Sequence, residues 1–339
     1  MGREALAGSH ERIIEDLPNM ISRNRLGVIL KLIVSIALVA WLLSSVGLED
    51  ALARLLDIKG SWLALALLGG VVQSLIGTLR WLAVMRAINA PLGFVRVLRF
   101  SFIGAFFNQA LPSSVGGDAV RGYLVYKAGG KLAPAVHGVL LDRVVTLLAL
   151  VVLVAVMAPI AAPQLSGADW FVPAAMTALA LGVSGTAVLM VMDKLPKSLI
   201  QFRLFRFFAA LAGDARRTFL QPAQGLWLLA LSVLGHVNLA FIVFSLFRGL
   251  EIDVSATECM MLFPPVLLLQ TVPISVAGWG VREGAMMALF ALIGVASDGA
   301  LAVSILYGLT LIIAGLPGAV LWLGSDVRNL KEAEAFGEH

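Results

Sequence analysis

Two arginines occupy corresponding places in two similar stretches of this chain. Residues 109–121 read QALPSSVGGDAVR, and residues 270–282 read QTVPISVAGWGVR. Each stretch breaks a hydrophobic run with proline and glycine, then restarts as a helix that carries Arg121 or Arg282. A guanidinium group recognises phosphate through paired hydrogen bonds, and a helix start offers free N–H groups to the same anion. The pattern therefore predicts anion sites, most naturally for phosphate.

Small residues surround both arginines. The glycines Gly116, Gly117, Gly278 and Gly280 would let a ligand or another backbone come close. Trp279 lies between the last two glycines and could line a cavity. The neighbouring amides are expected to satisfy backbone groups that the breaks leave free: Asn108, Gln109, Asn238 and Gln270.

A purely structural role for the arginines is the alternative. Arg121 could pair with Asp118 one turn earlier, and Arg282 could pair with an acid such as Asp142. Each arginine would then fix its hairpin instead of binding a ligand. Charged groups inside a membrane are costly and usually functional, which favours the anion site.

Two further ionisable residues are adjacent in a later apolar run. Asp142 and Arg143 point to different faces of one helix, so at least one needs a partner across the bundle. Glu283 is a candidate partner for Arg121 or Arg143. Asp142 or Glu283 could instead carry protons in a coupled transporter.

The elements that would position these residues belong to a membrane. The 339 residues are 60% hydrophobic and only 14% charged, which is too apolar for a soluble domain. The net charge of +4 does not suggest nucleic-acid binding. One cysteine, Cys259, allows no intrachain disulfide and no cysteine metal site. We interpret His137 and His236 as hydrogen-bonded packing residues, and expect neither a metal nor a cofactor.

The hydrophobic runs predict an all-α polytopic membrane protein with about six full spans. The expected spans are 26–46, 62–82, 134–158, 170–192, 225–247 and 301–323. The interrupted segments, 100–128 and 259–293, are expected to be re-entrant helical hairpins. If they crossed fully, the six cations of residues 194–217 would lie outside and the cation-free loop 161–169 inside, against the usual bias.

With hairpins, the chain divides into two halves of opposite orientation. Each half reads span, amphipathic piece, span, hairpin, span, which is an inverted-topology repeat with a site near the midplane. We expect a cytoplasmic N-terminal segment at 1–25, repeats at 26–160 and 161–324, and a cytoplasmic tail at 325–339. Residues 194–218 are basic and amphipathic, so they are expected to lie in the interface. Four tryptophans near span ends are interpreted as an interfacial belt: Trp62, Trp81, Trp170 and Trp227.

Three runs together resemble a known family. FFNQALPSSVGGDAVRGYLV (106–125), LLDRVVTLLAL (140–150) and PISVAGWGVREGAM (273–286) resemble the lysylphosphatidylglycerol synthase/flippase membrane-domain family. Arg80 and Trp81 also fit the second span of that family, and the resemblance covers nearly the whole chain. The motif positions on this resemblance are Asn108, Pro112, Gly116, Gly117, Asp118, Arg121, Asp142, Arg143, Gly278, Gly280, Arg282 and Glu283.

The resemblance implies a flippase-like protein that moves lipids between the leaflets of a bacterial-type inner membrane. Two-domain members carry a soluble aminoacyl-transferase domain after the membrane region. This chain ends about fifteen residues after its last expected span, so we do not expect the synthase chemistry. Stand-alone members could handle other lipids, including polyprenyl-phosphate-linked sugars or hopanoid-related lipids.

The leading hypothesis is therefore a lipid flippase or scramblase, and not an enzyme. Its ligand would be an anionic or phosphate-bearing head group, and it would draw energy from an ion gradient, a lipid gradient or a partner. A membrane-embedded lipid-modifying enzyme is the less favoured reading, because the chain lacks HExxH and GxSxG. A membrane module that supports a lipid-synthesising partner enzyme, and an exporter of small solutes, remain alternatives.

Overall fold

The computed structural model describes residues 57–110, 116–165, 169–196, 198, 201–272 and 278–324. Within these ranges every regular element is helical. Among the described helices, five are long and apolar enough to cross a membrane: α4 (Gly60–Ala87), α7 (Leu132–Ala161), α8 (Phe171–Val191), α11 (Pro222–Gly249) and α14 (Ser297–Leu323). The polytopic helical class is thus confirmed. The segments 1–25, 26–46 and 325–339 lie outside the described residues.

The long helices other than α8 extend beyond the apolar runs that predicted them. α4 begins two residues before the expected start at Trp62 and ends at Ala87 instead of Leu82. Because backbone hydrogen bonds continue into the polar interface, a helix does not stop where its side chains become charged. Hydropathy therefore locates a span better than its ends.

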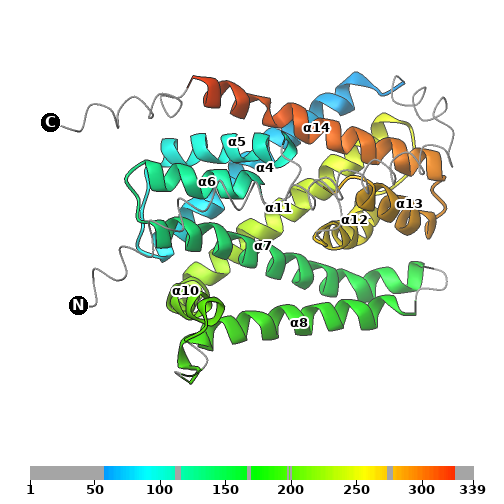
Figure 1. Cartoon of the computed structure of the whole chain (residues 1–339). Coiled ribbons are helices and arrows are strands. Elements are labelled where there is room, and N and C mark those ends of the chain that lie inside the picture. Colours follow the sequence, from blue (N-terminus) through cyan, green and yellow to red (C-terminus); the bar gives the residue numbers. More distant parts are fainter. Residues whose placement is uncertain are drawn as a thin grey trace, which may run out of the picture.

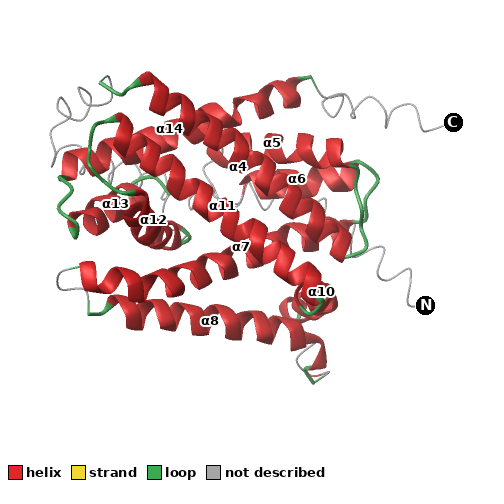
Figure 2. Ribbon diagram, turned by 180° about the vertical axis from the view of Figure 1, so that it is seen from behind, coloured by secondary structure: helices red, strands yellow, loops and turns green. Residues whose placement is uncertain are grey.

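Four shorter helices form two pairs. α5 (Phe94–Ala110) packs on α6 (Gly116–Lys127), and α12 (Ala256–Gln270) packs on α13 (Val281–Ala291) (Figure 1, Figure 2). At 1.5 Å per residue, none of the four reaches the roughly 30 Å thickness of a hydrocarbon core. The links 111–115 and 273–277, which hold Pro112 and Pro273, lie outside the described residues.

The two pairs occupy opposite ends of the bundle. Figure 1 shows α5–α6 at the end where α10 (Arg203–Phe219) lies across the long helices, and α12–α13 at the other end. The two pairs make corresponding contacts with the long helices. The first helix of each pair packs on one long helix, α5 on α14 and α12 on α7. The second helix packs on the other, α6 on α7 and α13 on α14. α4 and α11 lie against each other at the centre.

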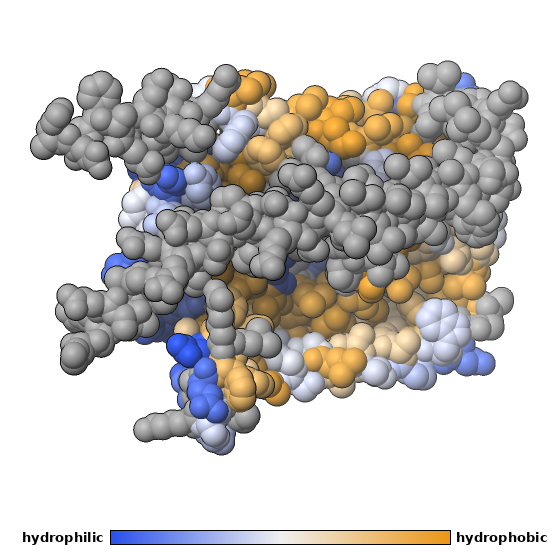
Figure 3. Space-filling model, viewed as in Figure 1, coloured by the Kyte–Doolittle hydropathy of each residue, from blue (hydrophilic) through white to orange (hydrophobic). Residues whose placement is uncertain are grey.

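Within the described residues, the core falls into two apolar clusters. One surrounds Phe247, Phe263 and Phe290 among α7, α11, α12, α13 and α14. The other surrounds Trp81 and Met85 among α4, α5, α6, α7 and α10. On the face drawn in Figure 3, the described surface that grey atoms leave visible is mainly apolar between hydrophilic patches near the two ends of the bundle, as expected for a surface in contact with lipid.

Candidate functional site

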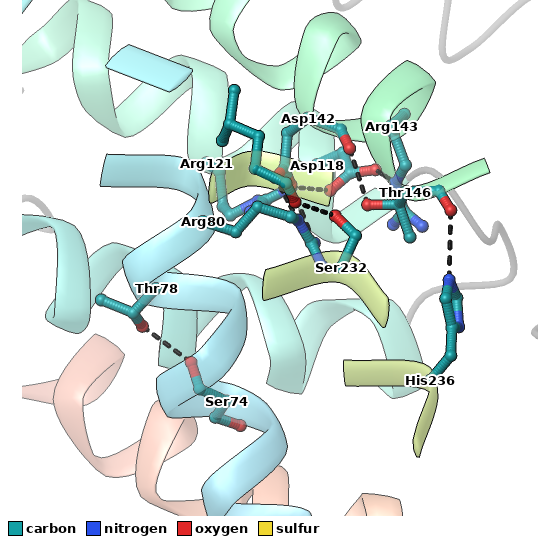
Figure 4. A network of polar contacts seen from close by, with 11 residues as sticks. Ser74, Thr78, Arg80, Asp118, Arg121, Asp142, Arg143, Thr146, Ser232 and His236 are labelled. Carbon is teal, nitrogen blue, oxygen red and sulfur yellow. Dashed lines mark hydrogen bonds and ion pairs between the residues drawn. The ribbon is translucent and has the colours of Figure 1, made fainter. Parts of the chain in front are cut away.

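The first charged cluster joins α4, α6 and α7 through Arg80, Asp118, Arg121, Asp142 and Arg143 (Figure 4). Asp142 Oδ1 accepts a hydrogen bond from Arg80 Nε at 2.7 Å, and its Oδ2 accepts from Arg121 Nη2 at 3.2 Å. Asp118 Oδ1 accepts from the same Nη2 at 2.5 Å, and its Oδ2 accepts from Arg143 Nε. Arg121 is thus paired with Asp118, as the structural alternative to an anion site required.

The cluster is buried and carries unequal charges. The side chains of Asp118 and Asp142 are 1% exposed and that of Arg121 is 9% exposed, whereas Arg143 is 49% exposed. Three arginines face two aspartates, so the cluster carries one excess positive charge within the described part of the chain. The four buried members, Arg80, Arg121, Asp118 and Asp142, balance one another, so the surplus charge lies at the half-exposed edge that Arg143 forms. An anion that reached this edge would be attracted by the surplus charge.

Two donors of this cluster have no acceptor among the described residues. They are Arg121 Nε and Trp81 Nε1, and both are buried. The Arg121 guanidinium lies over the Trp81 ring, with Cζ 4.7 Å from the ring centroid. Because buried N–H groups are nearly always hydrogen-bonded, the open donors mark a place where an acceptor oxygen would be stabilised.

Trp81 differs from its predicted role. We interpreted it as a residue of an interfacial belt, but its side chain is fully buried and supports Arg121. Trp170 and Trp227 are more than half exposed, as the belt requires. The prediction failed for Trp81 because it placed the end of the span at Leu82. The helix α4 continues six residues beyond Trp81, so this residue lies inside the helix and not near its end.

The hairpin that carries Arg121 is held by direct contact between two backbones. A Cβ added at Gly117 would overlap the Gly104 carbonyl oxygen, so only glycine lets α6 approach α5 this closely. The Gly117 N–H donates to Asn108 Oδ1 at 3.1 Å, and Asn108 thus satisfies backbone at the break, as expected. Gly116 begins α6. Gly104 also leaves room for the stem of Arg121.

The second charged cluster consists of Arg282, Glu283 and Ser304. Arg282 Nη2 donates to Glu283 Oε1 at 2.5 Å, and Arg282 Nε donates to Ser304 Oγ at 3.0 Å. The other carboxylate oxygen of Glu283 accepts from the Gly280 N–H at 2.6 Å. Both charged side chains are at most 2% exposed, and their charges cancel.

Aromatic rings and glycines complete this second cluster. The Arg282 guanidinium lies 4.6 Å from the centroid of Trp279 and 5.4 Å from that of Tyr307. Gly278 and Gly280 have φ angles of +82° and +88°, a left-handed conformation that favours glycine in the turn before α13. Trp279 therefore covers Arg282, and the turn is built around their contact.

The candidate pairings of Glu283 and Arg282 do not occur, whereas Asp142 has the partners across the bundle that were expected for it or Arg143. Glu283 was a candidate partner for Arg121 or Arg143, and Arg282 for Asp142. Instead Glu283 binds Arg282 and the start of its own helix, and Asp142 binds Arg80 and Arg121. Among the described residues, no hydrogen bond or ion pair joins the two clusters. The α5–α6 and α12–α13 pairs that carry them lie toward opposite ends of the bundle (Figure 1).

Sequence reasoning missed Arg80 as a site residue, along with Trp81, Ser304 and Tyr307. Arg80 was visible only as a motif position of the resembling family, although it lies inside the apolar helix α4. A charge within a span is a functional-site candidate by default, and that signal could have identified it. Ser304 and Tyr307 offered no comparable signal on the apolar helix α14.

The two histidines serve packing, as predicted. His137 Nδ1 lies 2.7 Å from Asp214 Oδ2, which ties α7 to α10. His236 Nε2 lies 3.1 Å from the Thr146 carbonyl oxygen, between α11 and α7 (Figure 4). Among the residues that the structure describes, no group of three or more His, Cys, Asp or Glu side chains could hold a metal ion.

Comparison with known proteins supports the resemblance noted in the sequence. Residues 28–318 match the family described as the lysylphosphatidylglycerol synthase TM region. A stretch of 126 residues is 29% identical to the UPF0104 membrane protein PH1989 of Pyrococcus horikoshii. That stretch spans 36% of this chain and 38% of the relative. Since the family match covers most of the chain, the protein belongs to the family of lysylphosphatidylglycerol synthase membrane regions.

Proposed function

We propose that this protein is a lipid flippase or scramblase that moves a phosphate-bearing lipid between the leaflets of a bacterial-type inner membrane. One observation carries the proposal: the first cluster has an excess positive charge, with Arg143 at its half-exposed edge, and two buried N–H donors without acceptors among the described residues. An anionic phosphate oxygen meets both needs. Membership of a family named for a lipid synthase supports a lipid as the ligand.

The proposed topology makes the two hairpins re-entrant from opposite sides. Positive-inside reasoning puts α10 and both chain termini on the cytoplasmic side, so α5–α6 would enter from the cytoplasm and α12–α13 from outside. The matched packing of α5 on α14 and α12 on α7 supports an inverted repeat in which α4 corresponds to α11 and α7 to α14. Rocking of one half against the other would then expose the site first to one side of the membrane and then to the other.

The two clusters would have different roles in this cycle. The first cluster would bind the phosphate through Arg121 while the acyl chains stay in the bilayer. The second cluster is neutral and closed, with Arg282 bonded to Glu283 and Ser304. We therefore assign phosphate binding to the first cluster and assign a structural role, holding the α13 turn, to the second.

A supporting role beside a lipid-synthesising enzyme is the second candidate. The family name favours it, because that family is the membrane region of a synthase. Tight co-purification with such an enzyme, together with no lipid movement by the isolated protein, would establish this role. Binding of a lipid phosphate at Arg121 is compatible with both candidates, so movement of lipid is the deciding observation.

Transbilayer movement of labelled lipids in liposomes tests the proposal. We would reconstitute the full chain and compare phosphatidylglycerol, phosphatidylethanolamine and a polyprenyl phosphate. Arg121→Gln is expected to abolish movement, because it removes the guanidinium over Trp81. Arg248→Gln is the matched control, since Arg248 pairs with exposed Asp253 far from the cluster. Movement at the wild-type rate in well-folded Arg121→Gln protein would refute the proposal.

A further inference from the structure

The balance of charges in the first cluster restricts which phosphate it can hold. Arg80, Arg121 and Arg143 contribute three positive charges, and Asp118 and Asp142 contribute two negative charges. One negative charge from a ligand beside half-exposed Arg143 would bring the cluster to neutrality. A second negative charge would leave the complex negative next to the buried carboxylates of Asp118 and Asp142, which is unfavourable.

Asp118 is the residue that sets this balance at the open side of the cluster. Its carboxylate bonds to Arg121 on one oxygen and to Arg143 on the other. Arg143 is the half-exposed member, whereas Asp142 is enclosed between Arg80 and Arg121. Asp118 therefore holds two guanidinium groups that a more highly charged ligand would otherwise recruit.

We propose that Asp118 sets the charge specificity of this site, so that the site accepts a phosphate diester with one negative charge and rejects a doubly charged phosphate monoester. This inference rests on the proposed phosphate site, but not on lipid transport. The open donors Arg121 Nε and Trp81 Nε1 supply two contacts for the oxygens of the diester. Asp118 keeps Arg143 from adding a third strong contact that would favour the dianion.

Two lipids that differ mainly in this charge provide the test. Phosphatidylglycerol is a diester with one negative charge at all relevant pH values. Phosphatidic acid is a monoester, and phosphate monoesters lose their second proton at about pH 6. With matched acyl chains carrying a fluorophore, binding to the purified full chain in detergent can be followed by fluorescence anisotropy.

The wild-type protein should discriminate between the lipids only where their charges differ. At pH ~8 we expect phosphatidylglycerol to bind at least about ten-fold more tightly than phosphatidic acid, because only the diester gives a neutral complex. At pH ~5 phosphatidic acid carries a single charge, and the difference should fall below about three-fold. Competition by dimethyl phosphate and methyl phosphate shows whether a free phosphate is enough for binding or the lipid is required. If the free phosphates bind, we expect the diester to bind more tightly than the monoester, as for the lipids.

Asp118→Asn is the decisive variant. It keeps the shape of the side chain and an acceptor oxygen, but it raises the excess charge of the cluster from one to two. The preference at pH ~8 should reverse in favour of phosphatidic acid, because the dianion would now give the neutral complex. If this variant does not fold, Arg143→Gln decides instead: it removes the excess charge and should weaken phosphatidylglycerol binding about ten-fold. Arg248→Gln is the control and should leave both affinities unchanged.

The results separate the failure of this inference from the failure of the proposed function. Equal binding of both lipids to the wild-type protein at pH ~8, or an unchanged preference in Asp118→Asn, would overturn the charge specificity. Binding that Arg121→Gln removes, in a protein that moves no lipid in liposomes, would overturn transport and leave the charge specificity standing. No binding of either lipid would overturn both.

Discussion

The two charged clusters follow corresponding breaks in the chain, but their partners differ. Arg282 meets Glu283 on the next residue, and the pair is neutral and shielded by Trp279. Arg121 shares its two aspartates with Arg80 and Arg143, so positive charge is left over. A saturated pair can hold a turn in place, whereas an unsaturated cluster has capacity for a ligand. Two similar stretches thus differ in their net charge, because α7 adds Asp142 and Arg143 and α4 adds Arg80 to the first cluster only.

The hairpins that carry the arginines differ as well. Gly117 meets the backbone of Gly104, which cannot move aside without displacing α5. A Cβ added at Gly278 would come nearest to side-chain atoms of Gln270. A backbone contact fixes the separation of two helices, while a side chain can change rotamer. We expect the first hairpin to be the more rigid platform, as a site for an ordered phosphate contact requires.

The largest predicted loss of stability comes from Asp142→Ala. This change leaves Arg80 and Arg121 short of their shared acceptor in a buried place, so we expect a loss of about 3–5 kcal/mol in the free energy of unfolding. Denaturant unfolding in detergent measures it, with exposed Asp253→Ala as the control. A cost no larger than that of the control would show that the cluster does not hold α4, α6 and α7 together.

The second cluster should behave as an isolated pair in a double-mutant cycle. Arg282→Met alone leaves Glu283 charged and buried, with an expected cost of about 3 kcal/mol or more. Adding Glu283→Gln removes that charge and keeps an acceptor for the Gly280 N–H. We therefore expect the double variant to recover most of the loss in denaturant unfolding. Strictly additive costs would contradict the assignment of a closed pair.

Glycine substitutions test the close contact between α5 and α6, and we expect smaller losses of stability from them. Gly117→Ala forces α6 away from Gly104 and should cost about 1–3 kcal/mol of unfolding free energy. Gly77→Ala is the matched control, because a Cβ there meets no atom within 4 Å. In a helix interior that control should be neutral or stabilising by up to about 1 kcal/mol. Equal effects of the two variants would contradict the close contact of α5 with α6.

The surface pair Lys59–Glu251 should give the smallest effect. Its atoms lie 2.5 Å apart, but both side chains are exposed. The hydrogen bond from Lys59 lowers the pKa of Glu251, so any stabilisation is present above the ordinary carboxyl pKa and is lost as pH falls through the lowered value. Glu251→Gln should therefore leave the melting temperature nearly unchanged at neutral pH. If Glu251→Gln lowered the melting temperature as much as Asp142→Ala does, solvent exposure would not explain the difference in strength between the surface pair and the buried cluster.

The sequence predicted the parts of this structure that depend on local patterns. Apolar runs located the spans, Pro112 and Pro273 located the breaks, and one-turn spacing suggested the bond between Asp118 and Arg121. The bond between Arg80 and Asp142 joins residues 62 positions apart, so it depends on how α4 packs on α7. The burial of Trp81 depends on the same packing. Partner choice among buried charges is a tertiary property, which local spacing does not determine.

Lipid movement by two matched double variants tests the central comparison most directly. Arg121→Met with Asp118→Asn removes a bonded pair from the first cluster, and Arg282→Met with Glu283→Gln removes the pair from the second. Both would be reconstituted in liposomes after cooperative unfolding confirms that they fold. We predict that the first variant moves no labelled phosphatidylglycerol and that the second moves it at close to the wild-type rate. Loss of movement in the second variant with retention in the first would contradict the division of roles between the two clusters.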